Sequence, residues 1–272
     1  MPQFSANLSY LFTEVPFLDR FAEAAQAGFR AVEFTFPYEW AVRDIAERAA
    51  RHGLEVVLLN APPGDLGAGD RGLASLPGRE HEFAASIAKG LRYAQELRCP
   101  RMHVMAGVVP YDADAKERER RRRLYVRQLK QACEDAAAHG VTVTIEPLNP
   151  RDMPGYLLRT QAEAHAIREE VGFANLKVQF DLYHAQIVEG DLTEKLRRYI
   201  AHVGHIQIAG VPGRHEPGIG EINYEWLFRV IDELGYDGWV GCEYRPVGGT
   251  AAGLAWMGRL IGRKRDPASA DD

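Results

Sequence analysis

Short apolar runs alternate along the chain with longer segments in which apolar residues recur every three or four positions. The short runs predict eight β-strands, at residues 4–9, 30–34, 54–59, 101–105, 141–145, 176–180, 203–208 and 238–242. The run at 54–59, LEVVLL, is continuously apolar, which is typical of a strand buried on both faces. The longer segments predict helices at residues 16–28, 39–52, 80–97, 112–139, 160–170, 192–202, 223–234 and 251–261.

This regular alternation of strand and helix indicates the fold class. It requires parallel strands joined by helical crossovers. We therefore expect an α/β fold, a single-domain (β/α)8 TIM barrel over residues 1–261, because eight such units in about 250 residues match the usual size of that barrel. An open, doubly wound sheet is the alternative, but the first strand–helix turn has no GxGxxG sequence. The polar sequence GRKRDPASADD at residues 262–272 predicts a disordered tail.

Composition narrows the class of partner. The 272 residues carry 33 basic and 38 acidic side chains, a formal net charge of −5. A weakly acidic chain is a poor general phosphate binder, so we expect no nucleic-acid partner. No apolar run of about 18 residues and no signal peptide is visible, so we expect no membrane association. The three cysteines form an odd, sparse set, which favours reduced thiols in the cytoplasm over a disulfide framework.

Four predicted strand ends carry oxygen-bearing side chains, and catalytic groups of barrels gather at such ends. They are Glu146, Asp181, Gln207 and Glu243. One strand-end carboxylate is usually an ion-pair partner or a loop cap, but three together repel one another and need a cation or a shared proton. Oxygen ligands suit Mg²⁺, Mn²⁺ or Co²⁺ better than zinc, because no cysteine or histidine cluster accompanies them. The pattern predicts a divalent metal site whose ion is left open.

The two glutamates of this set predict a chemistry. Glu146 and Glu243 follow the fifth and eighth predicted strands, on opposite sides of the ring. A metal between them would hold a substrate with one carboxylate near each face. That arrangement suits proton transfer at a carbon next to a carbonyl group, where the metal polarises the carbonyl and the glutamates remove and return the proton.

Further polar residues are expected at the same mouth. Asn60, at the end of the third strand, can hydrogen-bond a hydroxyl group or cap a turn. Arg71 and Arg214 lie in glycine-rich loops and are candidates to bind a substrate carboxylate, because a guanidinium presents a fork of donors. His184 lies just beyond the sixth strand, where a substrate contact and a structural role are equally open. His103 lies inside the fourth strand, and we expect it in the core.

Several segments resemble those of one known family, in the same order along the chain. They lie on or next to predicted strand ends between about residues 3 and 257, and they read FSANLSYLF, FTFPYEW, GDRGLASLPGRE, IEPLN, QFDLYHAQ, HIQIA, EPGIGEINY and CEY. The chain is similar to the hydroxypyruvate isomerases, which belong to the xylose isomerase-like barrels together with ketose 3-epimerases and endonuclease IV.

The resemblance implies an isomerase that interconverts hydroxypyruvate and tartronate semialdehyde through a metal-stabilised enediolate. It implies Glu146 and Glu243 as the acid/base pair, and His184 and Arg214 as substrate contacts. The metal ligands that it implies are Glu146, Asp181, Gln207 and Glu243. Related ketose epimerases have a histidine where this chain has Gln207, and an amide oxygen is a weaker ligand than imidazole for many transition metals, so the identity of the metal stays open.

Other functions are weighed against this one. Isomerisation of 2-oxo-tetronates and 3-epimerisation of ketoses use the same chemistry, and the sequence pattern does not separate them. DNA repair of the endonuclease IV type is disfavoured by the net charge and by the few histidines at strand ends. A non-catalytic binding barrel is disfavoured because clustered acids without a role are destabilising. The expected partner is a small 2-oxo acid or ketose, and a homo-oligomer is left open.

Overall fold

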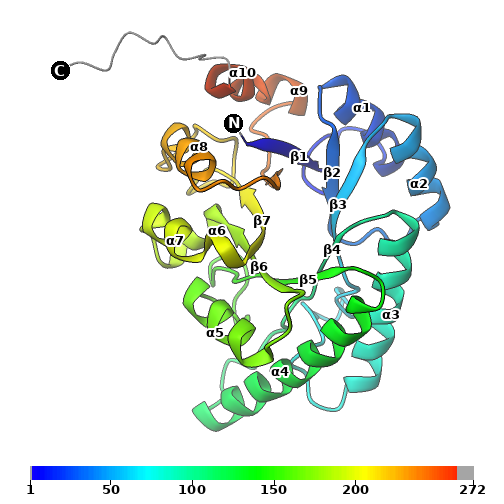
Figure 1. Cartoon of the computed structure of the whole chain (residues 1–272), viewed down its shortest axis with the longest axis vertical. Coiled ribbons are helices and arrows are strands. Elements are labelled where there is room, and N and C mark those ends of the chain that lie inside the picture. The colour runs from blue at the N-terminus through cyan, green and yellow to red at the C-terminus, as the bar shows by residue number, and fades with distance from the viewer. Residues whose placement is uncertain (1, 262–272) are drawn as a thin grey trace.

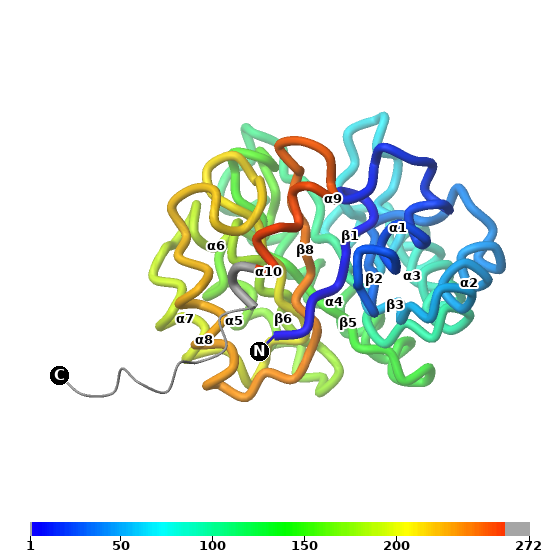
Figure 2. Tube along the Cα trace, turned by 90° about the horizontal axis from the view of Figure 1, so that it is seen from above, coloured from blue at the N-terminus to red at the C-terminus, as the bar shows by residue number. Residues whose placement is uncertain are grey.

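Eight parallel strands form a closed barrel within residues 2–261, the part of the chain that the computed structural model describes (Figure 1). The strands are β1 (Gln3–Asn7), β2 (Ala31–Phe34), β3 (Glu55–Asn60), β4 (Arg101–His103), β5 (Thr142–Ile145), β6 (Leu176–Asp181), β7 (Val203–Ile208) and β8 (Trp239–Cys242). β1 pairs with both β2 and β8, and Figure 2 shows β1 beside β8 where the ring closes. The predicted (β/α)8 barrel is therefore confirmed.

Helices surround the strands as an outer ring (Figure 1). They are η1 (Phe17–Asp19), α1 (Arg20–Gln26), α2 (Val42–Arg51), α3 (Glu80–Glu96), α4 (Ala115–Ala137), α5 (Gln161–Val171), α6 (Leu182–Val188), α7 (Leu192–Tyr199), η2 (Ile200–His202), α8 (Tyr224–Glu233), α9 (Thr250–Gly253) and α10 (Ala255–Ile261). None of the helices in the described part of the chain combines the length and the apolar character needed to cross a membrane.

Local sequence accounts for where the helices begin and how they face solvent. α5 begins at a capping box, in which the Thr160 side chain accepts from the Glu163 backbone N–H and the Glu163 side chain accepts from the Thr160 backbone N–H. The helix ends at Gly172, whose φ of 76° lies in the left-handed region. The charged start of α4 is neutralised within the helix, for example by Arg121, whose Nε lies 2.7 Å from Glu117 Oε1. That segment is a solvated helix face with compensating charges.

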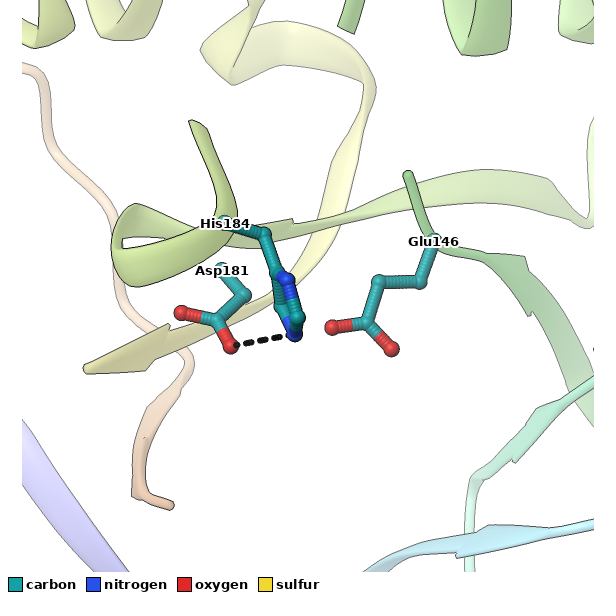
Figure 3. Close-up of side chains that lie close together, drawn as sticks. All are labelled: Glu146, Asp181 and His184. Atoms are coloured by element: carbon teal, nitrogen blue, oxygen red, sulfur yellow. Dashed lines mark ion pairs between the residues drawn. The ribbon is translucent and has the colours of Figure 1, made fainter. Parts of the chain in front are cut away.

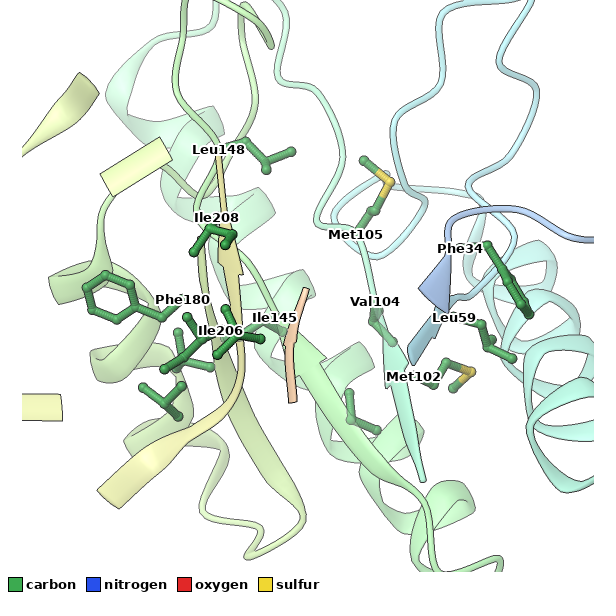
Figure 4. Close-up of a cluster of buried hydrophobic side chains, with 14 of the residues drawn as sticks. Phe34, Leu59, Met102, Val104, Met105, Ile145, Leu148, Phe180, Ile206 and Ile208 are labelled. Carbon is green, nitrogen blue, oxygen red and sulfur yellow. The ribbon is translucent and has the colours of Figure 1, made fainter. Parts of the chain in front are cut away.

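Side chains alternate between the two faces of each strand, and this places polar groups inside the barrel. In β7, Ile206 and Ile208 belong to the apolar layer between strands and helices, part of which Figure 4 shows. His205 and Gln207 alternate with them and instead contact Glu33 of β2, which is not a neighbouring strand. The inside of this barrel therefore holds a polar layer beneath its mouth.

Apart from shifts at the ends of elements and short 3-10 turns, two differences from the predicted elements stand out. α6, which the sequence pattern did not indicate, begins directly after β6, and Asp181 is both the end of the strand and the N-cap of this helix. The predicted helix at 251–261 is divided at Leu254 into α9 and α10. The predicted tail at 262–272 lies outside the described residues.

Candidate active site

A cavity of about 540 Å³ opens at the carboxyl ends of the strands. Six of the predicted site residues line it, namely Asn60, Arg71, Glu146, His184, Arg214 and Glu243. Asp181 and Gln207 are 1% exposed and do not line it, but each contacts a residue that does. All eight predicted site residues therefore belong to one place, as expected from their positions at strand ends and in the following loops.

Glu146 follows β5 and is almost completely buried. Its Oε1 has no hydrogen-bond partner among the described residues, and its Oε2 lies 3.6 Å from His103 Nδ1. Burial raises the pKa of Glu146 well above its ordinary value, and the negative charges of Glu243 and Asp181 raise it further. This carboxyl group is therefore ready either to hold a proton or to bind a cation.

Asp181 presents one oxygen to its own helix and the other to the site. Its Oδ1 accepts the Tyr183 backbone N–H at 2.8 Å, which caps α6. Its Oδ2 has no hydrogen bond among the described residues and lies 3.6 Å from His184 Nε2 and 3.7 Å from Arg214 Nη2. Burial raises the pKa of Asp181 to about 6, although the positive charge of Arg214 acts against this shift.

The tautomer of His184 follows from its partners. The backbone N–H of Asn149 can only donate, and it lies 3.0 Å from His184 Nδ1, so Nδ1 is the acceptor nitrogen. Burial holds the pKa of His184 well below its ordinary value, so the ring is neutral and carries its proton on Nε2. His184 is therefore placed as a hydrogen-bond donor toward the cavity that it lines.

The residues present fit a divalent cation. One ligand atom each from Glu146, Asp181 and His184 lies within 4.8 Å of the others, and Figure 3 shows the two carboxylates on either side of the imidazole. The two buried carboxylate oxygens without partners, Glu146 Oε1 and Asp181 Oδ2, are the kind of ligand that hard cations take. His184 enters such a site as a ligand only in its other tautomer. The predicted metal site thus has a chemical basis in the structure, and its ligand set stays a prediction.

Gln207 and Glu243, the other two predicted ligands, are engaged with protein groups. Glu243 accepts from Asn7 Nδ2 at 2.9 Å, from Gln207 Nε2 at 2.5 Å and from Arg214 Nη2 at 2.5 Å. Gln207 Oε1 in turn accepts from Gln179 Nε2 at 2.5 Å. Burial raises the pKa of Glu243 to about 8, against the opposing charge of Arg214. The three donors stabilise the ionised form of this glutamate.

Arg214 is the charge that balances this acidic group. Its backbone φ is 56°, and its guanidinium carbon lies 4.9 Å from the ring centre of Tyr10 and 5.0 Å from that of Tyr183. Although burial opposes the charged form, the Glu243 carboxylate and its neighbours raise the pKa of Arg214 above its ordinary value. Its Nη1 also lies 3.6 Å from Asp152 Oδ2. Arg214 therefore stays charged and is committed to protein carboxylates.

The remaining predicted residues stand at the rim. Asn60 is the last residue of β3, and its side chain lines the cavity while its backbone oxygen accepts from Tyr38 Oη at 2.6 Å. Arg71 donates from Nη1 to the backbone oxygens of Asp70 and Leu66, at 2.6 and 3.2 Å. These bonds hold Arg71 in its loop and leave the rest of its guanidinium to the cavity.

Sequence reasoning missed several groups. His103 is buried as expected, but it also lines the cavity, and neither ring nitrogen has a hydrogen-bond partner among the described residues. Burial lowers its pKa to about 3, so the ring is neutral. Arg151 and Arg245 also line the cavity. The sequence pattern also gave no role to Glu33, which lies in the predicted strand RAVEF. A glutamate among the apolar residues of a buried strand was the one feature that could have indicated it.

Comparison with known proteins places the chain in a family. The family model described as "Xylose isomerase-like TIM barrel" matches residues 21–260. A 2-oxo-tetronate isomerase of Cupriavidus necator is 59% identical over 97% of this chain and 100% of its own length. A hydroxypyruvate isomerase of Escherichia coli is 44% identical, over 94% of this chain and 98% of its own.

Solved structures show the same architecture. A structure from Brucella melitensis, described as an AP endonuclease of family 2, is 47% identical, covers 95% of this chain and 99% of its own, and superposes with a TM-score of 0.92. A D-psicose 3-epimerase of Clostridium cellulolyticum, 20% identical over 100% of this chain and 93% of its own, has a TM-score of 0.75 and supports the fold alone. The chain therefore belongs to the xylose isomerase-like TIM barrel family, within its hydroxypyruvate isomerase group, and it is an isomerase.

Proposed function

We propose that the chain interconverts hydroxypyruvate and tartronate semialdehyde. The observation that carries this proposal is the pair Glu146 and Glu243, two buried glutamates that follow β5 and β8 and line one cavity. Each has a raised pKa, so each holds a proton more readily than an ordinary glutamate does. The isomerase names of the relatives support the same reaction class.

Proton transfer accounts for the whole reaction. In hydroxypyruvate the hydroxymethyl carbon is adjacent to the ketone, so removing one of its protons gives an enediolate. Returning a proton to the former ketone carbon, together with transfer of the hydroxyl proton from the terminal oxygen to the neighbouring oxygen, gives the aldehyde isomer, and no oxidant or reductant is needed. We assign the removal to Glu243, because its three donors favour the carboxylate, and the return to Glu146, whose Oε1 lacks a donor.

Other groups orient the substrate. The proton on His184 Nε2 can be donated to a substrate oxygen in the cavity, and Asn60 offers an amide for a hydroxyl group. Arg71 supplies a positive charge at the rim for the substrate carboxylate, while Arg214 holds Glu243.

We propose Mg²⁺, Mn²⁺ or Co²⁺ as the cofactor, held by Glu146, Asp181 and Glu243. Gln207, the fourth ligand expected from the sequence, would join them only through Oε1 and only by giving up the hydrogen bond from Gln179, because its Nε2 donates to Glu33 and Glu243. Such an ion supplies polarisation of the substrate carbonyl when it is bound. The two unpartnered carboxylate oxygens, Glu146 Oε1 and Asp181 Oδ2, support this assignment. The same proposal includes a cytoplasmic location and no nucleic-acid partner, in keeping with the net charge of −5 and the free cysteines.

A second candidate is isomerisation of a 2-oxo-tetronate, one carbon longer. It is favoured by the name of the Cupriavidus necator relative and by a cavity of about 540 Å³, which is ample for either acid. The chemistry at the reacting carbons is the same. The two candidate reactions differ only in the additional hydroxylated carbon of the substrate, which residues at the rim of the cavity would have to bind.

The test is a substrate panel with purified protein and added Mg²⁺ or Mn²⁺. Hydroxypyruvate, 2-oxo-tetronates and free ketoses are incubated separately, and products are identified by nuclear magnetic resonance in deuterated water. We expect turnover of at least one 2-oxo acid, with exchange of the transferred proton for solvent deuterium. Absence of turnover for every 2-oxo acid, or turnover of ketoses alone, contradicts the proposal.

A further inference from the structure

Glu33 is a carboxylate that the proposed mechanism does not use, and it is fully buried in β2. It accepts from Gln207 Nε2 at 2.7 Å and Asn7 Nδ2 at 3.2 Å on one oxygen, and from Ser5 Oγ at 2.7 Å on the other. His205 Nε2 lies 2.8 Å from the second oxygen. Burying a carboxylate is costly unless donors surround it, and here they come from β1 and β7.

This carboxylate determines how the amide of Gln207 is turned. Gln207 Nε2 lies 2.7 Å from Glu33 Oε1 and 2.5 Å from Glu243 Oε2, while its oxygen accepts from Gln179. Turned over, the amide would place its oxygen against two carboxylate oxygens and its NH₂ against the NH₂ of Gln179. All three bonds would be lost. Gln207 therefore presents a donor, and not an acceptor, to Glu243.

The backbone is shaped to allow this arrangement. The pairing registers shift between Val32 and Glu33 and between Val178 and Gln179, and such bulges redirect side chains. Gly241 on β8 leaves the space that Glu33 fills, because a Cβ there would lie 2.4 Å from both carboxylate oxygens. Two irregular strand positions and one glycine thus accommodate a side chain that never reaches the cavity.

We propose that Glu33 is a positioning residue that acts through Gln207 to hold the Glu243 carboxylate for proton transfer. The inference rests on the proposed function, in which Glu243 removes the proton. Without Glu33, the Gln207 NH₂ loses one of its two acceptors and the orientation of the amide is no longer fixed. The reacting groups must meet at about 3 Å, so a small displacement of Glu243 lowers kcat far more than substrate affinity.

Three variants separate positioning from stability. Glu33→Leu removes both acceptor oxygens, and we expect kcat to fall about tenfold or more with KM within about twofold. Glu33→Gln can turn its oxygen toward Gln207 and its NH₂ toward Ser5 and His205, so it should recover most of the lost kcat. Gly241→Ala displaces Glu33 without removing any polar group, and it should resemble Glu33→Leu.

The matched control is Glu216→Leu. Glu216 is also buried, but it accepts the Val247 backbone N–H in a loop and does not line the cavity. It should lose stability while kcat stays within about twofold of the wild type. If Glu33→Leu and Glu33→Gln lose kcat equally, or if folded Gly241→Ala keeps the wild-type kcat, the positioning role is wrong.

A second measurement does not depend on activity. Crystal structures of Gly241→Ala, and of Glu33→Leu where it folds, should show the Gln207 Nε2 to Glu243 Oε2 distance lengthened beyond hydrogen-bonding range. An unchanged contact overturns the inference even if the wild type converts no 2-oxo acid. Conversely, an active wild type with unchanged kcat in both variants overturns the role of Glu33 and leaves the proposed function standing.

Discussion

The Nη2 atom of Arg214 lies 2.5 Å from Oε1 of Glu243, in the mouth of the barrel. The same nitrogen lies 3.7 Å from Asp181 Oδ2, and the guanidinium carbon lies over the rings of both Tyr10 and Tyr183. Arg214 therefore pairs with carboxylates of the protein itself. The sequence had suggested instead that it binds the carboxylate of the substrate.

Arg214→Gln should shift the pH dependence of activity. Removing the cation raises the pKa of Glu243, so the rise of kcat/KM with pH should move to higher pH. Breaking a buried ion pair also costs about 3 kcal/mol of unfolding free energy. A pH–rate profile and urea unfolding measure the two effects, and Arg214→Lys should restore part of both. An unchanged profile would show that Arg214 does not set the protonation of Glu243.

Glu146→Gln and Glu243→Gln should each lower kcat by about 10²–10⁴-fold, the usual contribution of a positioned acid or base. Both side chains are buried and the substitutions keep their shape, so the variants should fold. Circular dichroism provides the folding control. A variant with wild-type turnover would remove that glutamate from the proton transfer.

In the metal-free protein, stability should fall as pH rises from about 6.5 to about 8. Below this window the buried neutral histidines His103 and His184 act in the opposite direction, because their pKa values are lowered in the folded state. Burial raises the pKa of Asp181 from 3.8 to about 6 and that of Glu243 from 4.5 to about 8. Such groups bind their protons more tightly in the folded state than in the unfolded state, so each loses stability between its unfolded and its folded pKa. Urea unfolding in a chelator across this range measures it, and the slope should be smaller in Glu243→Gln. A stability that rises over this window contradicts the shifts.

Added Mn²⁺ should stabilise the protein more at pH 8 than at pH 5. The cation needs deprotonated carboxylates, and it binds the folded state only. Thermal unfolding with and without Mn²⁺ at the two pH values measures the effect, with Asp181→Asn as the variant that should lose most of it. An equal shift of Tm at both values, or in the variant, would point to a site elsewhere.

Arg151 and Arg245 are cavity-lining arginines with no side-chain hydrogen bond or ion pair observed in the described part of the chain, unlike Arg214. We expect Arg151→Gln and Arg245→Gln to raise KM for a 2-oxo acid about tenfold, since a charge-assisted hydrogen bond is lost, with little change in kcat. Arg159→Gln, in the same loop as Arg151 but outside the cavity, is the control. Unchanged KM in both variants would leave Arg71 as the carboxylate receptor.

The loop of Arg71 offers a matched pair of glycines. Gly72 stands at φ 108° with a hypothetical Cβ 2.3 Å from Met105 O, whereas Gly69 stands at φ 92° with nothing within 4 Å. Gly69→Ala should cost only the backbone strain, about 1 kcal/mol, and Gly72→Ala clearly more, because Met105 must also move. Urea unfolding measures the free energy of unfolding of both variants. Equal decreases would show that the loop can move to accommodate a Cβ at Gly72.

Much of this fold follows from the order of apolar runs, because parallel strands joined by helices close in few ways. The eight strands lie where the pattern predicts them, within a few residues at the ends. α6 escaped notice because its seven residues are too few for a helical period, and its start depends on the side chain of Asp181. Such a cap is recognisable only when the strand end is already known.

The placement of Glu146 and Glu243 at one cavity was predictable, because both follow strand ends of a parallel barrel. A contact was not predictable where the partner lies far along the chain. Glu33 and Gln207 are 174 residues apart and meet only because β2 and β7 face each other across the barrel. The choice between substrate contact and charge balance for Arg214 likewise depends on atoms of Glu243 and Asp181 that no local pattern reveals.

The two oxygens of Asp181 have different partners, and this difference bears on which ions the proposed metal site would accept. Because Oδ1 accepts the backbone N–H that caps α6, Oδ2 is the oxygen of Asp181 that is left without a partner and available to an ion. Large cations such as Ca²⁺ are coordinated by about six to eight oxygens, often from bidentate carboxylates. Mg²⁺ is coordinated by fewer oxygens in a near-ideal octahedral geometry. In the proposed metal site, the start of a short helix would therefore favour small ions over large ones.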